Sequence, residues 1–153
     1  MASDNKMVDD IQVGAFKLLN EEYGVNILNV QEIKVMTDIT RIPFAPDYVK
    51  GVMNLRGSVL PVIDLKRRLG LADAPYTDAS RIIVMKIGEL SVGMIVDAVT
   101  EVMTIDGRRI ESAKSVSDGG APNPFIDGIG KVNDRLIIML NLDEIVDLPE
   151  ELK

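Results

Sequence analysis

Short runs of apolar residues recur along the whole chain, separated by glycine, proline and polar turns. The runs either alternate with polar residues or consist of β-branched residues, and both patterns are typical of strands. Predicted strands cover residues 11–19, 23–27, 28–33, 52–55, 59–63, 81–87, 90–96, 99–105, 126–132 and 136–140. Short strands joined by glycine turns favour small closed barrels over a parallel sheet, so we expect a mostly β protein.

Two short helices are predicted, each after a late strand in its half of the chain. Asp64 has the side chain of a helix N-cap, and the helix that follows it over residues 65–69 ends at Gly70. A second helix is expected at residues 143–146. A single helical turn is expected at residues 46–50, where a proline starts it and a glycine stops it.

The two halves of the chain resemble each other in the order of their motifs, which indicates an internal duplication. The aligned blocks are Tyr23-Gly24-Val25 with Val92-Gly93-Met94, residues 30–33 with 99–102, Gly51-Val52 with Gly128-Ile129, and residues 59–65 with 136–142. The offset between the blocks grows along the chain. This places an insertion in the Ser, Gly and Pro-rich stretch at residues 112–123, which we expect to be a mobile loop.

The repeat predicts two five-stranded barrels, at residues 11–76 and 77–147, each with a short helix after its last strand. Residues 1–10 are expected to form a flexible tail, and residues 148–153 a C-terminal tail. A unit of this size is marginal alone, because it buries only about 60% of its unfolded surface. We therefore expect the two units to pack together around a third apolar contact zone.

The turn at Arg56-Gly57 is the position where the two halves differ most in chemistry. It lies between two apolar runs, where it would present a guanidinium at the edge of a sheet, and Gly57 can adopt a positive φ angle at little cost. The second half has Asn133-Asp134 in the corresponding turn. Because the scaffold repeats and the turn does not, we interpret Arg56 as a contact residue.

Composition argues against an enzyme. The chain has no histidine and no cysteine, which removes the commonest general base, the commonest metal ligand and all thiol chemistry. The acidic pairs Asp9/Asp10, Glu21/Glu22 and Asp143/Glu144 could supply carboxylates, but a tail, a turn and a helix start explain them. No glycine-rich loop has the spacing of a phosphate-binding loop, and no cofactor is expected.

Charge and aromatic content argue against nucleic-acid binding. The net charge is −7 and aromatic residues make up 4% of the chain, so neither phosphate neutralisation nor base stacking is favoured. No apolar run is long enough to cross a membrane, and the N-terminus lacks the apolar region of a signal peptide. The absence of cysteine suits a reducing compartment, so a cytoplasmic location is expected.

Several motifs together resemble the CheW chemotaxis coupling-protein family over residues 11–147. They are EYGV at residues 22–25, VQEI at 30–33, VKGVMNLRG at 49–57, PVIDL at 61–65 and VGMIVD at 92–97. The resemblance implies two SH3-like five-stranded barrels. It also implies a non-enzymatic adaptor that joins the cytoplasmic tip of a chemoreceptor to the CheA histidine kinase in a signalling array, through the kinase's regulatory domain. The alternative is a coupling domain of the same fold in another two-component pathway.

The resemblance also implies roles for individual residues. The residues that match the receptor-binding positions of the family are Val30, Arg56, Gly57, Val92, Gly93 and Val99. Those that match the kinase-binding positions are Ile27, Glu32, Ile33, Lys50 and Gly51. Residues 109–116 correspond to a further partner-contacting segment. The family carries a basic and an aromatic residue where this chain has Glu111 and Val116, so the role of that segment stays open.

Overall fold

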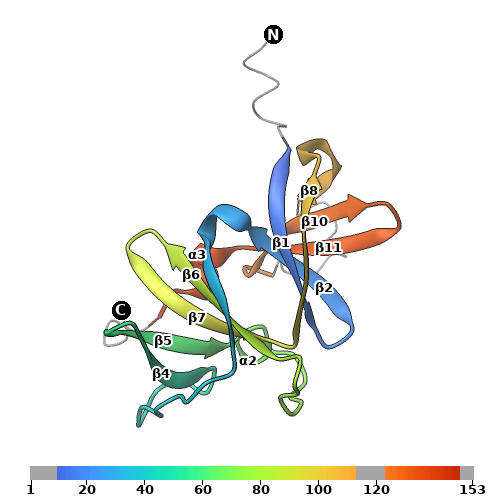
Figure 1. The fold of residues 1–153 in the computed structure, drawn as a ribbon. Helices are drawn as coiled ribbons and strands as arrows, with labels where there is room; N and C mark the ends of the chain where they lie inside the picture. Colours follow the sequence, from blue (N-terminus) through green and yellow to red (C-terminus); the bar gives the residue numbers. More distant parts are fainter. Residues whose placement is uncertain (1–9, 113–122, 149–153) are drawn as a thin grey trace.

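The computed structural model describes residues 10–112 and 123–148, and these fold into two sheets (Figure 1). The first sheet has six strands in the order β8-β1-β2-β11-β10-β9. Its strands are β1 (Ile11–Leu18), β2 (Glu21–Asn26), β8 (Ala98–Ile105), β9 (Ile110–Ser112), β10 (Ile126–Val132) and β11 (Arg135–Leu140). The predicted tails and the 112–123 loop lie almost wholly outside the described residues.

The second sheet has five strands in the order β3-β6-β7-β5-β4. Its strands are β3 (Val30–Val35), β4 (Val49–Leu55), β5 (Ser58–Asp64), β6 (Arg81–Ile87) and β7 (Leu90–Val96). The helical segments are η2 (Ile27–Asn29), α2 (Leu65–Arg68), η3 (Gly107–Arg109) and α3 (Leu142–Ile145). The predicted β-rich class of two packed units is therefore confirmed.

The predicted division at residue 76 is wrong for the sheets, because the two halves of the chain exchange a hairpin. The β1–β2 hairpin pairs with β8 and β11 of the second half, whereas the β6–β7 hairpin pairs with β3 and β5 of the first half. The physical cause is the shortness of two connections. The three residues of η2 carry the chain from β2 into the other sheet, and Asp97 alone joins β7 to β8.

The internal duplication is visible in this exchanged arrangement. Corresponding strands occupy the same order in both sheets, with β3, β6, β7, β5 and β4 matching β8, β1, β2, β11 and β10. The parallel pairs also correspond, since Val62 lies opposite Gly93 and Met139 opposite Gly24. The N-caps repeat too: Asp64 accepts a hydrogen bond from the N–H of Arg67, as Asn141 does from Glu144.

Three apolar clusters hold the fold together. One lies within the first sheet and contains Val13, Ala15 and Ile137; a second lies within the other sheet and contains Val62 and Ile82. The largest lies between the two sheets, and its members include Phe16, Tyr23, Ile83, Val92, Met94 and Ile145. This central cluster is the third contact zone predicted from the marginal size of each unit.

Alternate residues of the exchanged hairpins face different clusters. On β6, Ile82 belongs to the cluster within the five-stranded sheet and Ile83 to the central cluster. Because both faces are buried, these strands consist of continuous apolar runs without polar alternation. Gly24 and Gly93 lie at corresponding positions in the parallel pairs, and a Cβ on Gly93 would lie 2.9 Å from Cγ2 of Ile82. Both glycines are therefore required by close packing.

The local predictions for the helices are mostly confirmed. Asp64 caps α2, and Gly70 follows it with a φ of 75°. The expected helical turn at residues 46–50 is instead a hydrogen-bonded turn, in which the N–H of Val49 donates to the carbonyl of Pro46. Among the described residues, no helix is long and apolar enough to span a membrane.

Candidate functional site

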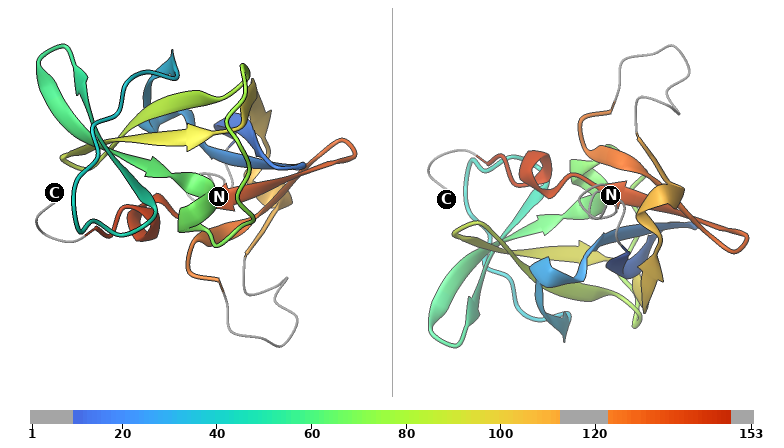
Figure 2. Two further views of the ribbon diagram at one scale, coloured as in Figure 1. Left: turned by 90° about the horizontal axis from the view of Figure 1, so that it is seen from below. Right: turned by 90° about the horizontal axis from the view of Figure 1, so that it is seen from above.

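The β4–β5 hairpin carries the Arg56-Gly57 turn away from the body of the protein. Both turn residues have positive φ angles, 53° for Arg56 and 89° for Gly57, as a two-residue type I′ turn requires. The side chain of Asn54 supports the turn by accepting a hydrogen bond from the N–H of Gly57. Figure 2 shows that this hairpin and the β10–β11 hairpin project at opposite ends of the molecule.

Arg56 holds a left-handed conformation that arginine adopts less readily than glycine or asparagine. The corresponding residue in the other hairpin is Asn133, which has a φ of 56° and suits that conformation better. Local backbone preference therefore does not explain an arginine at this turn. The hydrogen bond that its side chain donates to Glu32 gives a reason for an arginine at this position.

The guanidinium of Arg56 reaches across to the edge strand β3. Its Nη1 donates to Oε2 of Glu32 over 2.6 Å, while 73% of the Arg56 side chain stays exposed to solvent. The pair lies beside a shallow groove of about 490 Å³ that β3 and the β4–β5 hairpin form with Ser91. Arg56 and Glu32, predicted to face two different partners, thus lie on one surface.

The second half contains a counterpart of this ion pair, built from a different arginine position. Glu101 corresponds to Glu32, and its Oε2 accepts a hydrogen bond of 2.6 Å from Nη1 of Arg135. Arg135 also donates to both oxygens of Glu22, over 2.9 Å from Nε and 2.6 Å from Nη2. Two carboxylates therefore occupy three nitrogens of this guanidinium.

The difference between the two arginines lies in their second partner. Ser91 occupies the position in the first site that corresponds to Glu22, so no second carboxylate is present there. Within the described residues, Arg56 forms a hydrogen bond only with Glu32, through Nη1, and 73% of its side chain is exposed. Arg56 can therefore donate from Nε and Nη2 to an external carboxylate or carbonyl, whereas each of the three nitrogens of Arg135 already donates to a carboxylate.

Hydrogen bonding to Arg135 affects the ionisation of the Glu22 carboxyl. It lowers the pKa of the Glu22 carboxyl below its ordinary value of 4.5, with Thr100 adding a further hydrogen bond and burial opposing the shift. The same contacts raise the pKa of Arg135. The Glu22–Arg135–Glu101 cluster is therefore a structural cross-link between β2, β8 and the β10–β11 hairpin.

Three predicted residues lie at the edge of the central cluster. Val30 and Val99, which occupy corresponding positions in the two halves, are half-buried against it. Ile27 packs with Val30 over Gly14 of β1. These side chains keep some exposed surface at the junction of the two sheets, where a partner can reach them.

Val92 and Gly93, which match receptor-binding positions of the family, are buried and offer no surface to a receptor. Val92 has an exposed fraction of 0% and belongs to the central cluster. Gly93 is buried against Ile82, Met53 and Val62. The sequence motif that contains them is required for packing, because strand β7 is covered on both faces.

The residues predicted for the kinase divide into surface and scaffold. Ile33 is 47% exposed on the edge strand β3, and Lys50 is half-buried on β4 with its Nζ 5.4 Å from the ring centre of Tyr76. Gly51 is buried with a φ of 149°, and a Cβ there would overlap the carbonyl of Thr40. Gly51 therefore positions the segment before β4 and offers no side chain to a partner.

Sequence reasoning missed a buried cross-link at the junction of the sheets. The side chain of Lys66 is 2% exposed, and its Nζ lies 2.6 Å from Oδ1 of Asp97. The other oxygen of Asp97 accepts the N–H of Leu19 over 2.7 Å. This connection ties α2, the β7–β8 crossover and the β1–β2 turn together. Its only signal in the sequence is a lysine two positions after the N-cap Asp64.

Sequence reasoning also missed Arg68, which joins the two halves of the chain. Its guanidinium carbon lies 4.2 Å from the ring centre of Tyr48 and 4.8 Å from that of Phe125, residues at corresponding positions of the two halves. Its nitrogens donate to the carbonyls of Glu144 and Ile145 at the end of α3. Arg68 therefore joins the two pseudo-equivalent helices.

The sequence and the fold of this chain match one protein family. The family model of the CheW-like domain matches residues 12–150. The chain belongs to the CheW-like domain family.

Individual relatives agree with this result. The chemotaxis protein CheW of Klebsiella aerogenes is 35% identical over 135 residues, covering 88% of this chain and 81% of that protein. The chemotaxis protein CheW of Helicobacter pylori is 37% identical over 144 residues, covering 94% and 84%. The crystal structure of the scaffolding protein TtCheW from Thermoanaerobacter tengcongensis has a TM-score of 0.84 and 36% identity, covering 94% of this chain and 97% of that one.

These relatives confirm the predicted family and the predicted role as a coupling adaptor in chemotaxis. The residues described above are therefore carried by a CheW-like scaffold. Of the segment at residues 109–116, only Arg109 to Ser112 are described, and there Glu111 pairs with Lys131 over 2.7 Å. Its role remains a prediction.

Proposed function

We propose that this chain is a non-enzymatic adaptor that connects the cytoplasmic tip of a chemoreceptor to the regulatory domain of the CheA histidine kinase. The observation that carries the proposal is the state of Arg56. It is exposed, it is held in an unfavourable backbone conformation, and its Nε and Nη2 lack a partner among the described residues. Family membership and the chemotaxis names of the relatives support the pathway.

The receptor would meet the surface at the Arg56 turn. A receptor tip is a helical hairpin, and a helix end or an acidic side chain on a helix supplies carbonyl or carboxylate oxygens for a guanidinium. Val30 and Val99 would then contribute apolar contact at the sheet junction, where both keep partial exposure. Glu32 would keep Arg56 oriented through their 2.6 Å hydrogen bond.

The kinase regulatory domain would meet the neighbouring face of β3 and β4. Ile33 and Val35 are exposed on the edge strand β3, with exposed fractions of 47% and 65%, and Lys50 lies on β4. An exposed apolar pair on an edge strand suits contact with another small barrel. The Arg56–Glu32 pair lies where the two proposed surfaces adjoin.

The proposal is tested by titrating the isotope-labelled chain with a receptor-tip fragment and, separately, with the kinase regulatory domain. We expect the receptor fragment to shift the amide resonances of Arg56, Gly57 and Val30, and the kinase domain to shift those of Ile33 and Lys50. Ile129 and Leu136, on the opposite hairpin, serve as internal controls. Absence of saturable shifts with both partners would contradict the proposal.

A further inference from the structure

Phe44 is the most exposed large apolar residue of the described chain, with a relative exposure of 106%. It has a φ of 64°, an uncommon conformation for a bulky residue. The loop around it is fixed, because Thr40 exchanges two hydrogen bonds with Val52, over 2.9 and 2.8 Å, and the N–H of Val49 donates to Pro46. Pro43 precedes the ring directly. Phe44 is thus held away from the protein as a projecting apolar side chain.

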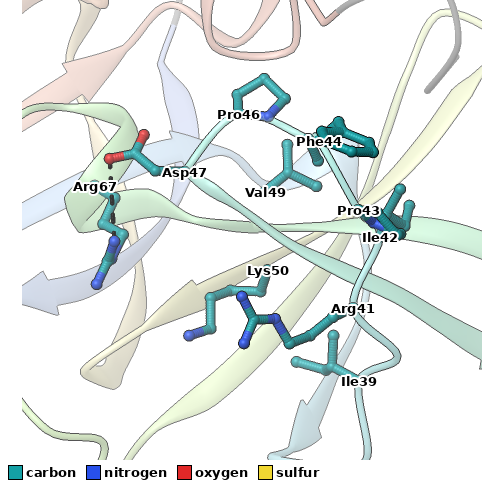
Figure 3. A pocket seen from close by; sticks show the side chains of 11 residues that line it. Ile39, Arg41, Ile42, Pro43, Phe44, Pro46, Asp47, Val49, Lys50 and Arg67 are labelled. Carbon is teal, nitrogen blue, oxygen red and sulfur yellow. Dashed lines mark ion pairs between the residues drawn. The ribbon is translucent and has the colours of Figure 1, made fainter.

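Three cationic side chains line the hollow that Phe44 also lines. This hollow of about 810 Å³ is lined by Arg41, Lys50 and Arg67, with Asp47 as its only acidic residue. Arg67 pairs with Asp73 over 2.8 Å and with Asp47 over 4.0 Å. Arg41 and Lys50 extend into the same space (Figure 3), and neither has a carboxylate within ion-pair distance among the described residues.

A second hollow of the same chain has the complementary character. It encloses about 640 Å³ between the β6–β7 turn and α3, and Ile87, Leu90 and Val146 supply its apolar surface. The acidic residues that line it are Glu89, Asp143, Glu144 and Asp147. Nearby, burial and the charge of Asp143 raise the pKa of the Asp127 carboxyl, which is consistent with concentrated negative charge in this region.

We propose that Phe44 of one copy of this chain inserts into the acid-lined hollow of a second copy. Arg41 and Lys50 would then lie against Glu89 and Glu144 of the second copy, so that both an apolar contact and two charge pairs form. The commitment to a second copy rests on this charge complementarity, since one chain displays both surfaces. It shares Lys50 with the proposed kinase surface, whereas Phe44 and Arg41 belong to neither proposed partner surface.

The geometry makes the contact head-to-tail. The two hollows share no lining residue, so each copy can donate Phe44 to one neighbour and accept Phe44 from another. Repetition of such a contact forms a ring or an open filament. A contact centred on one side chain buries less than a standard interface, and the net charge of −7 opposes association. We therefore expect association at roughly 0.1 to 1 mM protein.

The experiment is sedimentation velocity of the full chain from about 10 µM to about 1 mM at physiological salt. We expect the sedimentation coefficient of the wild type to rise with concentration. Phe44→Gly removes the ring and also relieves the positive φ, so it cannot unfold the loop through backbone strain. This variant should associate at least about tenfold more weakly. Leu28→Ala, which removes an apolar side chain that is 88% exposed elsewhere, should match the wild type.

A charge exchange provides the stricter test. The double variant Arg41→Glu/Lys50→Glu presents acids to the acidic hollow, and Glu89→Lys/Glu144→Lys presents bases to the basic surface. Each should remain monomeric alone, and an equimolar mixture should associate again, because every contact between unlike variants is complementary. Any one of three results would overturn the proposal. The wild type could stay monomeric at about 1 mM, Phe44→Gly could associate like the wild type, or the mixture of the two charge variants could stay monomeric.

Discussion

Nη1 of Arg56 lies 2.6 Å from Oε2 of Glu32, and this pair unites two residues that the sequence had assigned to different partners. Arg56 comes from the β4–β5 turn and Glu32 from the edge strand β3, so the proposed receptor and kinase surfaces adjoin. The counterpart in the other half joins Arg135 to Glu101 and Glu22. Arg56 keeps two nitrogens without a partner among the described residues, whereas all three nitrogens of Arg135 donate to carboxylates of the protein itself.

Double-mutant cycles should separate these two ion pairs. For Arg56 and Glu32 we expect a coupling energy below about 1 kcal/mol, because the Arg56 side chain is 73% exposed and solvent screens the pair. For Arg135 and Glu22, with two hydrogen bonds and less exposure, we expect a larger value of about 1 to 3 kcal/mol. Urea unfolding of the single and double alanine variants measures both. A larger coupling for Arg56 would show that it is structural.

Two glycines of the family motif should respond differently to alanine. Gly51→Ala would place a Cβ on the carbonyl of Thr40, so we expect a loss of at least about 3 kcal/mol in the free energy of unfolding. Gly57→Ala meets no atom within 4 Å and has only the strain of its positive φ, about 1 to 2 kcal/mol. Chemical denaturation of both variants makes the comparison, and equal losses would contradict the different roles given to these glycines.

Removing the charge of Asp97 should cost more stability than removing the charge of its buried partner Lys66. Asp97→Asn leaves a lysine that is 2% exposed without its anion, and we expect a loss of about 3 kcal/mol or more. Lys66→Met keeps the apolar length of the side chain and leaves a carboxylate that is partly hydrated and still bonded to Leu19, so about 1 kcal/mol is expected. Unfolding free energies test the order, and a costlier Lys66→Met would contradict it.

The Glu22 cluster should be sensitive to acid. The pKa of the Glu22 carboxyl is lowered in the folded state. The contribution of Glu22 to the free energy of unfolding is therefore fully present above its ordinary pKa of 4.5, and it is lost as the pH falls through the lower pKa of the folded state. The stability difference between the wild type and Glu22→Gln should therefore be constant above about pH 5.5 and shrink below it. Unfolding from pH 7 to pH 3 measures this difference. A difference that grows in acid would contradict the assigned direction.

Much of the fold could be predicted from the sequence because it follows from local signals. The apolar runs located every strand except β9, the Asp64 cap and Gly70 located α2, and the repeated blocks revealed the duplication. The hairpin exchange could not be predicted, since periodicity identifies a strand but not the sheet to which it belongs. The exchange depends on how far Ile27–Asn29 and Asp97 carry the chain, which is a three-dimensional property.

The candidate site was predicted less completely. Arg56 stood out because its turn differs from its counterpart around Asn133, and the structure shows it exposed. Val92 carried no such signal, since a valine on a strand with both faces buried resembles one at an interface. The Glu32–Arg56 pair, the Lys66–Asp97 pair and the exposed ring of Phe44 depend on long-range geometry, which residue spacing does not contain.

The central claim is that the guanidinium of Arg56 contacts the receptor, and Arg56→Asn tests it most directly. Asparagine suits the left-handed turn, as Asn133 does in the other hairpin, so circular dichroism and unfolding should show a fold as stable as the wild type to within about 1 kcal/mol.

Isothermal titration of this variant with a receptor-tip fragment is the deciding measurement. We predict at least about a tenfold loss of affinity for the receptor fragment, because charge-assisted hydrogen bonds are removed. The kinase regulatory domain should bind the same variant with affinity within about threefold of the wild type, which serves as the control. A folded Arg56→Asn variant that binds the receptor fragment as tightly as the wild type would contradict the account.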